Sequence, residues 1–283
     1  MMRRWLAVLV AALALLPAAT GATAPIQQMP IRQTRVVSLV PAATEMLFAL
    51  GAGDLLVGVS SYDSWPPEVE SLPRVGALID PDVERVLSLR PQVVVVDPSQ
   101  SGLIAQLRAA GIRTYPYATG SLAAIIEHAA GLGAAVGREA DGERVSADLR
   151  ARLADIATEV AGRARPSVLL VFGRRPGAFA ELWVNGGVGF LADLVDLAGG
   201  DGMFTDLERP SFRASLEVLL ARPPEVVIEA DADGDLATLR DEWQGLPGFD
   251  SVRLVRLDPE TALVPGPRVV ETARLLAEAF HGR

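Results

Sequence analysis

The sequence of 283 residues contains no cysteine. Disulfide bonds, thiolate ligands for a metal and a cysteine nucleophile are therefore excluded. A lipid attached through a cysteine at the end of an export signal is excluded for the same reason. The fold must be held by packing, and the chain is long enough to form two ordinary lobes with their own cores.

Histidine is scarce and lysine is absent. The histidines are His128 and His281, and neither has a second candidate ligand nearby in the sequence. A histidine-based metal site or a Ser-His-Asp triad is therefore not expected. The formal net charge of −9 argues against nucleic acid as a partner.

The N-terminal residues have the pattern of an export signal. Arg3 and Arg4 precede an apolar run over residues 5–19 and small residues over 20–24. The run is short for a membrane span and typical of a secretory signal peptide. We expect residues 1–22 to be removed on export, which leaves the mature chain in the periplasm without a membrane anchor. A retained anchor is the alternative interpretation.

Short apolar runs alternate with helical patterns over residues 35–137. The pattern predicts a parallel sheet covered by helices, which is an α/β lobe. Thr44 is a candidate N-cap for the first helix. The expected strands are 35–40, 56–60, 93–96 and 113–117, and the expected helices are 44–50, 83–89 and 103–109.

Residues 138–165 have a different character, because charged residues and alanine surround a single apolar stripe. The stripe has helical spacing and predicts one helix of about 25 residues, roughly 37 Å long. Pro166 ends it. The members of the stripe are Val145, Leu149, Leu153, Ile156 and Val160.

Residues 166–283 form a second α/β set. Strands are expected at 167–172, 225–229 and 252–257, and helices at 189–197, 216–220 and 268–280. Residues 83–95 align with 216–228 without a gap, and each stretch reads as a helix, a proline stop and a buried strand. The sequence therefore predicts two similar parallel-sheet lobes, 35–137 and 166–283, joined by one long backbone helix.

Several stretches resemble a known family. They are RVVSLVPAATEMLFAL (35–50), VGVSSYDSWPP (57–67), PDVERVLSLRPQVVVV (81–96), DLERPSFRASLEVLL (206–220) and GPR (266–268). The chain resembles the periplasmic binding proteins whose two lobes are bridged by a single helix, the group that serves importers of vitamin B12, haem and ferric siderophores. The resemblance implies a monomer that delivers a small-molecule ligand to the permease of an ABC importer. The SSYDSWPP, DVERV and DLERP segments look most like the cobalamin-binding branch.

The resemblance places the ligand in a cleft between the lobes, lined by loops that follow the strands. Cobalamin binders tend to carry tryptophan where this chain has Leu78, Asp97 and Ser211, so a related corrinoid or another chelate stays open. Tyr62 and Trp65 either stack on the ligand or pack within their own loop. The predicted ligand-binding residues are Tyr62, Trp65, Leu78, Asp97, Trp183, Ser211 and Phe212.

The resemblance also implies two docking residues. In the family a glutamate on each lobe pairs with arginines of the permease, and by motif these correspond to Glu84 and Glu217. Both occupy the first turn of equivalent predicted helices, where a glutamate also stabilises the helix through its dipole. If they dock, each must be exposed to solvent.

Other readings stay open within and outside the class. A ferric siderophore would be held by arginines such as Arg174, Arg175 or Arg209, and haem would need an axial donor such as Tyr62. A periplasmic enzyme is the rival from another class, but the sequence offers no nucleophile with a base, no metal site and no resident cofactor. The glycine-rich loop 185–189 lacks the ending of a phosphate-binding loop. Asp231, Asp233 and Asp235 lack the closing glutamate of a calcium loop.

Overall fold

Strands and helices alternate along the chain from Val36 to His281. The computed structural model describes residues 34–282, except for 176, 180–181 and 231–234. The predicted signal peptide and the residues Asp231 and Asp233 lie outside the described residues. In the part that is described, no helix combines the length and the apolar character needed to cross a membrane.

The first sheet is entirely parallel, with the strand order β2-β1-β3-β4. Strands β1 and β3 are buried along their whole length, as central strands of a parallel sheet must be. The strands are β1 (Val36–Ser38), β2 (Leu56–Val59), β3 (Val93–Val96) and β4 (Arg113–Pro116). All four lie within the ranges that the sequence predicted.

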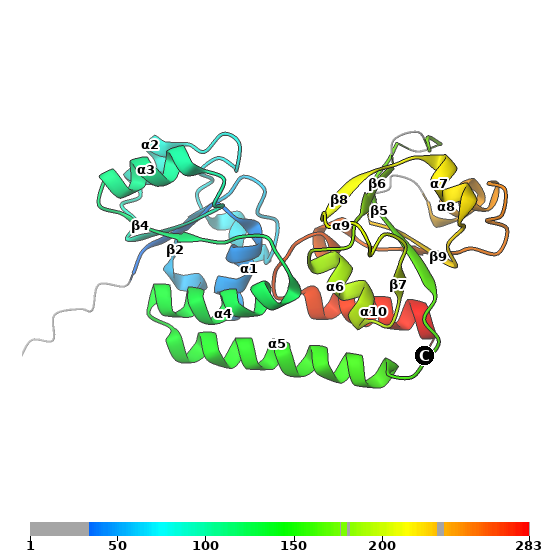
Figure 1. Cartoon of the computed structure of the whole chain (residues 1–283). Helices are drawn as coiled ribbons and strands as arrows, with labels where there is room; N and C mark the ends of the chain where they lie inside the picture. Colours follow the sequence, from blue (N-terminus) through cyan, green and yellow to red (C-terminus); the bar gives the residue numbers. More distant parts are fainter. Residues whose placement is uncertain (1–33, 176, 180–181, 231–234, 283) are drawn as a thin grey trace, which may run out of the picture. The chain divides into compact units, whose positions relative to one another are not determined.

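Helices cover both faces of this sheet. Val37 and Val94 face a core shared with α2 (Val83–Ser88) and α3 (Ser101–Ala109), whereas Val36 faces the opposite side. There α1 (Pro41–Ala49) and α4 (Leu122–Val136) complete the layer, as Figure 1 shows. A short 3-10 helix, η1 (Gly53–Leu55), precedes β2 in the chain, and a second one, η2 (Pro67–Ser71), follows it.

The predicted start of α1 at Thr44 was wrong. The helix begins at Pro41, and Thr44 is fully buried within it. Proline suits the first position of a helix, because its fixed φ is helical and its missing N–H would have had no partner there. The hydroxyl of Thr44 lies 3.4 Å from the carbonyl oxygen of Val40 and therefore bonds back along the helix.

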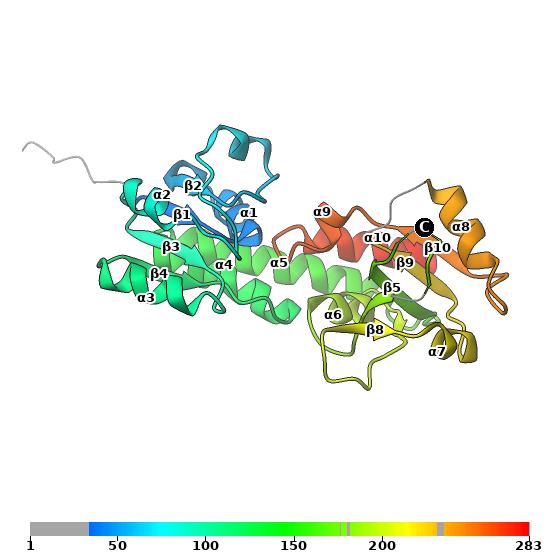
Figure 2. The same ribbon diagram turned by 90° about the horizontal axis from the view of Figure 1, so that it is seen from above.

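The long backbone helix is confirmed as α5, Glu139–Val160, with 22 residues. All five residues of the predicted stripe are buried, and α5 packs against α4 and against the terminal helix α10 (Val269–His281). A side chain at Gly142 would come within 2.8 Å of the carbonyl oxygen of Ala129, so α4 and α5 approach closely there. Figures 1 and 2 both show α5 running beneath the elements of the two sheets.

The second sheet has the order β10-β9-β5-β6-β8, with β7 also paired to β5. Strands β5 (Ser167–Gly173), β9 (Val226–Glu229) and β10 (Arg253–Arg256) are parallel, as predicted for this half. The short strand β7 (Asp201–Gly202), which was not predicted, is also parallel to β5. Two further strands, β6 (Leu182–Asn185) and β8 (Ser211–Ala214), add an antiparallel ribbon that the sequence analysis did not predict. The helices of this half are α6 (Phe190–Leu197), α7 (Leu216–Ala221), α8 (Leu236–Gln244), α9 (Pro259–Ala262) and α10.

The two sheets share a hydrophobic core. One cluster of buried side chains runs from Val36 on β1 through the stripe of α5 to Phe280 on α10. We call the elements around the first sheet the N-terminal lobe and those around the second sheet the C-terminal lobe. The limits 35–137, 138–165 and 166–283 remain a proposal, because from Thr34 onward the chain is one unit by its contacts.

Candidate functional site

Polar contacts tie the two lobes together at their junction. The hydroxyl of Tyr117 donates to the carbonyl oxygen of Pro265 at 2.8 Å. The backbone N–H of Leu122 donates to Asp193 at 2.7 Å, which holds the start of α4 against α6. The backbone N–H of Phe190 reaches the carbonyl oxygen of Gly120 at 2.9 Å. The predicted ligand-binding residues of the N-terminal lobe lie in the loops after β2 and β3 and in the loop 76–80, and those of the C-terminal lobe lie on β6 and β8.

The loop that follows β2 presents two aromatic side chains to solvent. Tyr62 is 75 % exposed and Trp65 is 47 % exposed, which is unusual for such large apolar groups. The loop itself is anchored, because the guanidinium of Arg74 donates to the carbonyl oxygens of Ser60 at 3.0 Å and Asp63 at 2.7 Å. Tyr62 and Trp65 therefore project from a fixed backbone.

A second loop, residues 76–80, lies against the first. The backbone N–H of Ser61 donates to the carbonyl oxygen of Gly76 at 2.8 Å. Gly76 has a φ of 82°, and a side chain there would lie 2.4 Å from the carbonyl oxygen of Asp80. Leu78 is 45 % exposed and Ile79 is 93 % exposed. Ile79 was not among the predicted ligand-binding residues.

Gln100 connects this second loop to Asp97, the predicted site residue at the end of β3. The side-chain amide of Gln100 donates to the carbonyl oxygen of Leu78 at 3.0 Å and accepts from the backbone N–H of Asp97 at 3.1 Å. The carboxylate of Asp97 accepts bonds from the backbone N–H and the hydroxyl of Ser99. Asp97 therefore shapes the turn after β3.

The C-terminal lobe contributes Trp183 on β6. Its side chain is 40 % exposed and lies beside Gly173, which has no side chain to displace it. The guanidinium of Arg213, opposite it on β8, is 5.2 Å from the ring centre. The positive charge of Arg213 therefore lies next to the exposed indole of Trp183, within the range of a cation–π contact.

Two other predicted residues of this lobe lie at β8. Ser211 is half-buried at the start of the strand. Phe212 is also half-buried and packs edge-on against Phe204, with the ring centres 4.8 Å apart, next to the core of the lobe. Val188, in the glycine-rich loop before α6, is 44 % exposed and was not among the predicted residues.

Two acidic residues are buried beneath the aromatic loop. Asp63 is only 4 % exposed. Burial raises its pKa to about 6, and the hydroxyl of Thr44, the backbone of Ser60 and the charge of Arg74 offset this only in part. Burial also raises the pKa of Glu45, against the hydrogen bonds and charge of Arg268, which lower it. Burial thus favours the neutral form of both carboxyl groups, and nearby arginines oppose this effect.

Arg174 does not serve the ligand, which corrects the expectation that it could hold an anionic chelate. Its side chain is 1 % exposed, with Nε 2.5 Å from the buried Glu229 and Nη2 2.7 Å from Glu242. The rings of Phe179 and Trp243 flank the guanidinium at 5.1 and 5.6 Å. A cation that is enclosed and already paired in this way is structural, whereas Arg175 and Arg209 are exposed.

The predicted docking residues occupy equivalent positions. Glu84 lies in the first turn of α2 and Glu217 in the first turn of α7, and both are exposed, as the prediction required. Asp82 caps α2 by accepting from the backbone N–H of Arg85 at 2.9 Å. The pKa of Glu217 is lowered by its own backbone N–H and by Ser215, so its carboxylate is charged at neutral pH.

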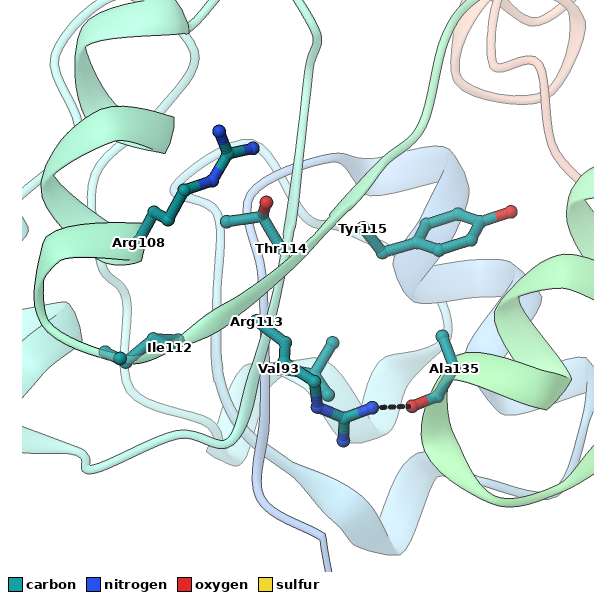
Figure 3. A pocket seen from close by; sticks show the side chains of 8 residues that line it. Val93, Arg108, Ile112, Arg113, Thr114, Tyr115 and Ala135 are labelled. Atoms are coloured by element: carbon teal, nitrogen blue, oxygen red, sulfur yellow. Dashed lines mark hydrogen bonds between the residues drawn. The ribbon is translucent and has the colours of Figure 1, made fainter.

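A hollow of about 470 Å³ lies away from these residues, beside the edge strand β4 (Figure 3). In Figure 3 the side chain of Arg113 donates to the carbonyl oxygen of Ala135, at 3.4 Å. The ring of His128 stacks on Tyr117, with 4.0 Å between the ring centres. Among the described residues no group of three or more histidines and carboxylates is placed to hold a metal ion.

Comparisons with known proteins agree with this architecture. The vitamin B12-binding protein of Salmonella choleraesuis is 28 % identical over 248 residues, covering 87 % of this chain and 90 % of that protein. The periplasmic vitamin B12-binding protein of Vibrio cholerae has a similar structure, with a TM-score of 0.73 and 25 % identity. The match covers 87 % of this chain and 95 % of that protein. A periplasmic haem-binding protein of Pseudomonas aeruginosa is also similar, with a TM-score of 0.72 and 28 % identity. The match covers 88 % of this chain and 92 % of that protein. The family model described as periplasmic binding protein matches residues 36–258, and this chain therefore belongs to that family.

Proposed function

We propose that this protein is the substrate-binding component of an ABC importer, and that it captures cobalamin or a related corrinoid between its lobes in the periplasm. The observation that carries the proposal is the set of exposed aromatic side chains: Tyr62 and Trp65 on the anchored loop after β2 of the N-terminal lobe, and Trp183 on β6 of the C-terminal lobe. Such rings suit a large ligand with flat apolar faces. The names of the vitamin B12-binding relatives support the choice of a corrinoid.

The partner follows from the same class. We infer that the permease of the importer receives the protein, that the mature chain acts as a monomer without an anchor, and that it catalyses no reaction. The support is that the family and the relatives named above are binding proteins.

Haem is the second candidate, and the exposed phenol of Tyr62 favours it. A tyrosine oxygen is a known axial ligand of haem iron, and one structural relative is a haem-binding protein. Mixing the protein with haem tests this alternative, because coordination by Tyr62 must shift the Soret band and the Tyr62→Phe variant must abolish the shift. An unshifted band in the unmodified protein would remove haem.

Calorimetry with cyanocobalamin tests the leading proposal. We expect saturable binding, and we expect Tyr62→Ala and Trp65→Ala each to weaken it by about 10- to 100-fold, since each ring loses the burial of a large apolar side chain. Leu275→Ala is the matched control, because Leu275 is 48 % exposed on α10 and its loss should leave affinity unchanged. No heat at tens of micromolar ligand would reject the corrinoid.

Docking is tested by replacing Glu84 and Glu217 together with alanine. We expect ligand affinity to stay unchanged, because both side chains are exposed in α2 and α7 and neither belongs to the ligand-binding set. We expect uptake to fall, since a charge pair that becomes desolvated at an interface contributes more than one left in water.

The matched control for docking removes two other exposed glutamates, Glu70 and Glu143. Uptake that is equal for the control and for the Glu84 and Glu217 double variant would contradict the docking role.

A further inference from the structure

One ion pair joins the lobes and is nearly closed to solvent. Glu45 lies on α1 of the N-terminal lobe, and Arg268 lies 223 residues later, just before α10. Nε of Arg268 is 2.9 Å from one carboxylate oxygen of Glu45, and Nη2 is 2.5 Å from the other. The side chain of Arg268 is 13 % exposed and that of Glu45 is 4 % exposed. The geometry is that of a two-bond arginine–carboxylate pair, which fixes distance and orientation together.

The remaining donors of Arg268 bind its own lobe. Nη1 donates to the hydroxyl of Thr261 at 2.8 Å, and Nη2 donates to the carbonyl oxygen of Glu260 at 2.6 Å, both in α9. The guanidinium is therefore fixed on the C-terminal lobe independently of Glu45. It cannot follow a movement of α1 without losing bonds on one side.

The segment between α9 and α10 lies against the N-terminal lobe. A side chain at Gly266 would come within 3.3 Å of the carboxylate of Glu45 and 3.4 Å of the carbonyl oxygen of Ala42. The neighbouring Pro265 accepts the hydroxyl of Tyr117. Figures 1 and 2 show this segment reaching from the C-terminal lobe toward α1. It forms a connection between the lobes that is separate from α5.

The same guanidinium touches the aromatic loop. Its central carbon is 5.4 Å from the ring centre of Trp65, within the range of a cation–π contact. A cation of the C-terminal lobe thus holds an exposed aromatic side chain of the N-terminal lobe. This links the separation of the lobes to the orientation of a candidate ligand-binding ring.

We propose that Glu45 and Arg268 are positioning residues for ligand capture: their ion pair fixes the separation of the lobes and orients the indole of Trp65. Besides α5, the lobes share a hydrophobic core and the backbone hydrogen bonds of Leu122 and Phe190, and this ion pair adds a fixed point next to Trp65. The role in ligand capture rests on the proposed function. The separation of the lobes and the orientation of Trp65 can be measured without any ligand.

The absence of cysteine makes a distance measurement direct. Nitroxide labels on cysteines introduced at Gln106 of α3 and Asp241 of α8, both exposed, report the separation of the lobes. The test variant combines Glu45→Gln with Arg268→Met, so that no unpaired charge stays buried. We expect one narrow distance distribution for the unmodified protein and a broad one for the double variant.

Trp65 provides a second readout that loss of stability alone would not change. The fluorescence of Trp65 is obtained as the difference between each protein and its Trp65→Phe version. We expect acrylamide to quench this component more strongly in the double variant than in the unmodified protein, because the indole has lost the guanidinium beside it. The control is Arg274→Met, which breaks an exposed ion pair between α10 and Glu159 of α5 and should change neither readout.

The outcomes separate the inference from the proposed function. In a folded double variant, an unchanged distance distribution and unchanged quenching of Trp65 would overturn the inference, whether or not any ligand binds. Cyanocobalamin that fails to bind the unmodified protein would reject the proposed corrinoid alone. If it binds, we expect affinity to fall about tenfold in the double variant, since only a fraction of molecules then holds the binding-competent arrangement.

Discussion

Replacing Arg174 with methionine is expected to lower the free energy of unfolding by about 3–5 kcal/mol. The substitution leaves the carboxylate of Glu229, whose side chain is 0 % exposed, without its nearest cation. Methionine fills much of the space between Phe179 and Trp243, so the loss reports the unpaired charge more than a cavity. Chemical denaturation at neutral pH measures it.

A second substitution at the same site tests the cause. Adding Glu229→Gln to Arg174→Met removes the buried charge and keeps an oxygen that can accept from the indole N–H of Trp243, now at 2.6 Å. We expect the double variant to regain a large part of the lost stability. The matched control, Arg152→Met, breaks an exposed pair with Asp148 on α5 and should cost less than about 1 kcal/mol. A double variant no more stable than Arg174→Met would contradict the explanation by charge.

Replacing Asp63 with asparagine is expected to stabilise the protein at pH 8, relative to the unmodified protein, by about 2.5 kcal/mol more than at pH 4. The pKa of Asp63 is about 6 in the folded protein, against an ordinary value of 3.8. The folded state therefore holds its proton more tightly than the unfolded state. The cost of ionising Asp63 is absent below pH 3.8, grows between pH 3.8 and 6, and is complete above pH 6. Asparagine does not ionise and therefore never has this cost.

The measurement for Asp63 is the unfolding free energy of both proteins at several pH values from 4 to 8. The difference between them should rise with pH and level off above pH 6. A difference that does not depend on pH would contradict the burial of a titrating carboxyl group at this position. Because Asp63 lies between Tyr62 and Trp65, ligand titration of the same variant also shows whether the loop needs the carboxylate for its shape.

Local patterns in the sequence predicted much of the fold. The strand at Val93–Val96 and the stripe of α5 were predicted residue by residue, because burial on both faces of a strand or along one stripe of a helix leaves a periodic record. The gapless repeat likewise predicted that Glu84 and Glu217 occupy equivalent first turns. The antiparallel ribbon was missed, because β6 (LWVN) and β8 (SFRA) are short and lack the continuous apolar run that marks the buried parallel strands.

The candidate site divides in the same way. The sequence by itself determined the family, the aromatic loop with Tyr62 and Trp65, and the first-turn positions of Glu84 and Glu217, since these depend on contiguous motifs. Only the tertiary structure decided which charges are enclosed: Arg174 is paired with Glu229, 55 residues away, and Arg268 with Glu45, 223 residues away. The sequence does not distinguish an arginine that faces solvent from one that faces a buried carboxylate. Its role is set by the desolvation and the partner that folding imposes on it.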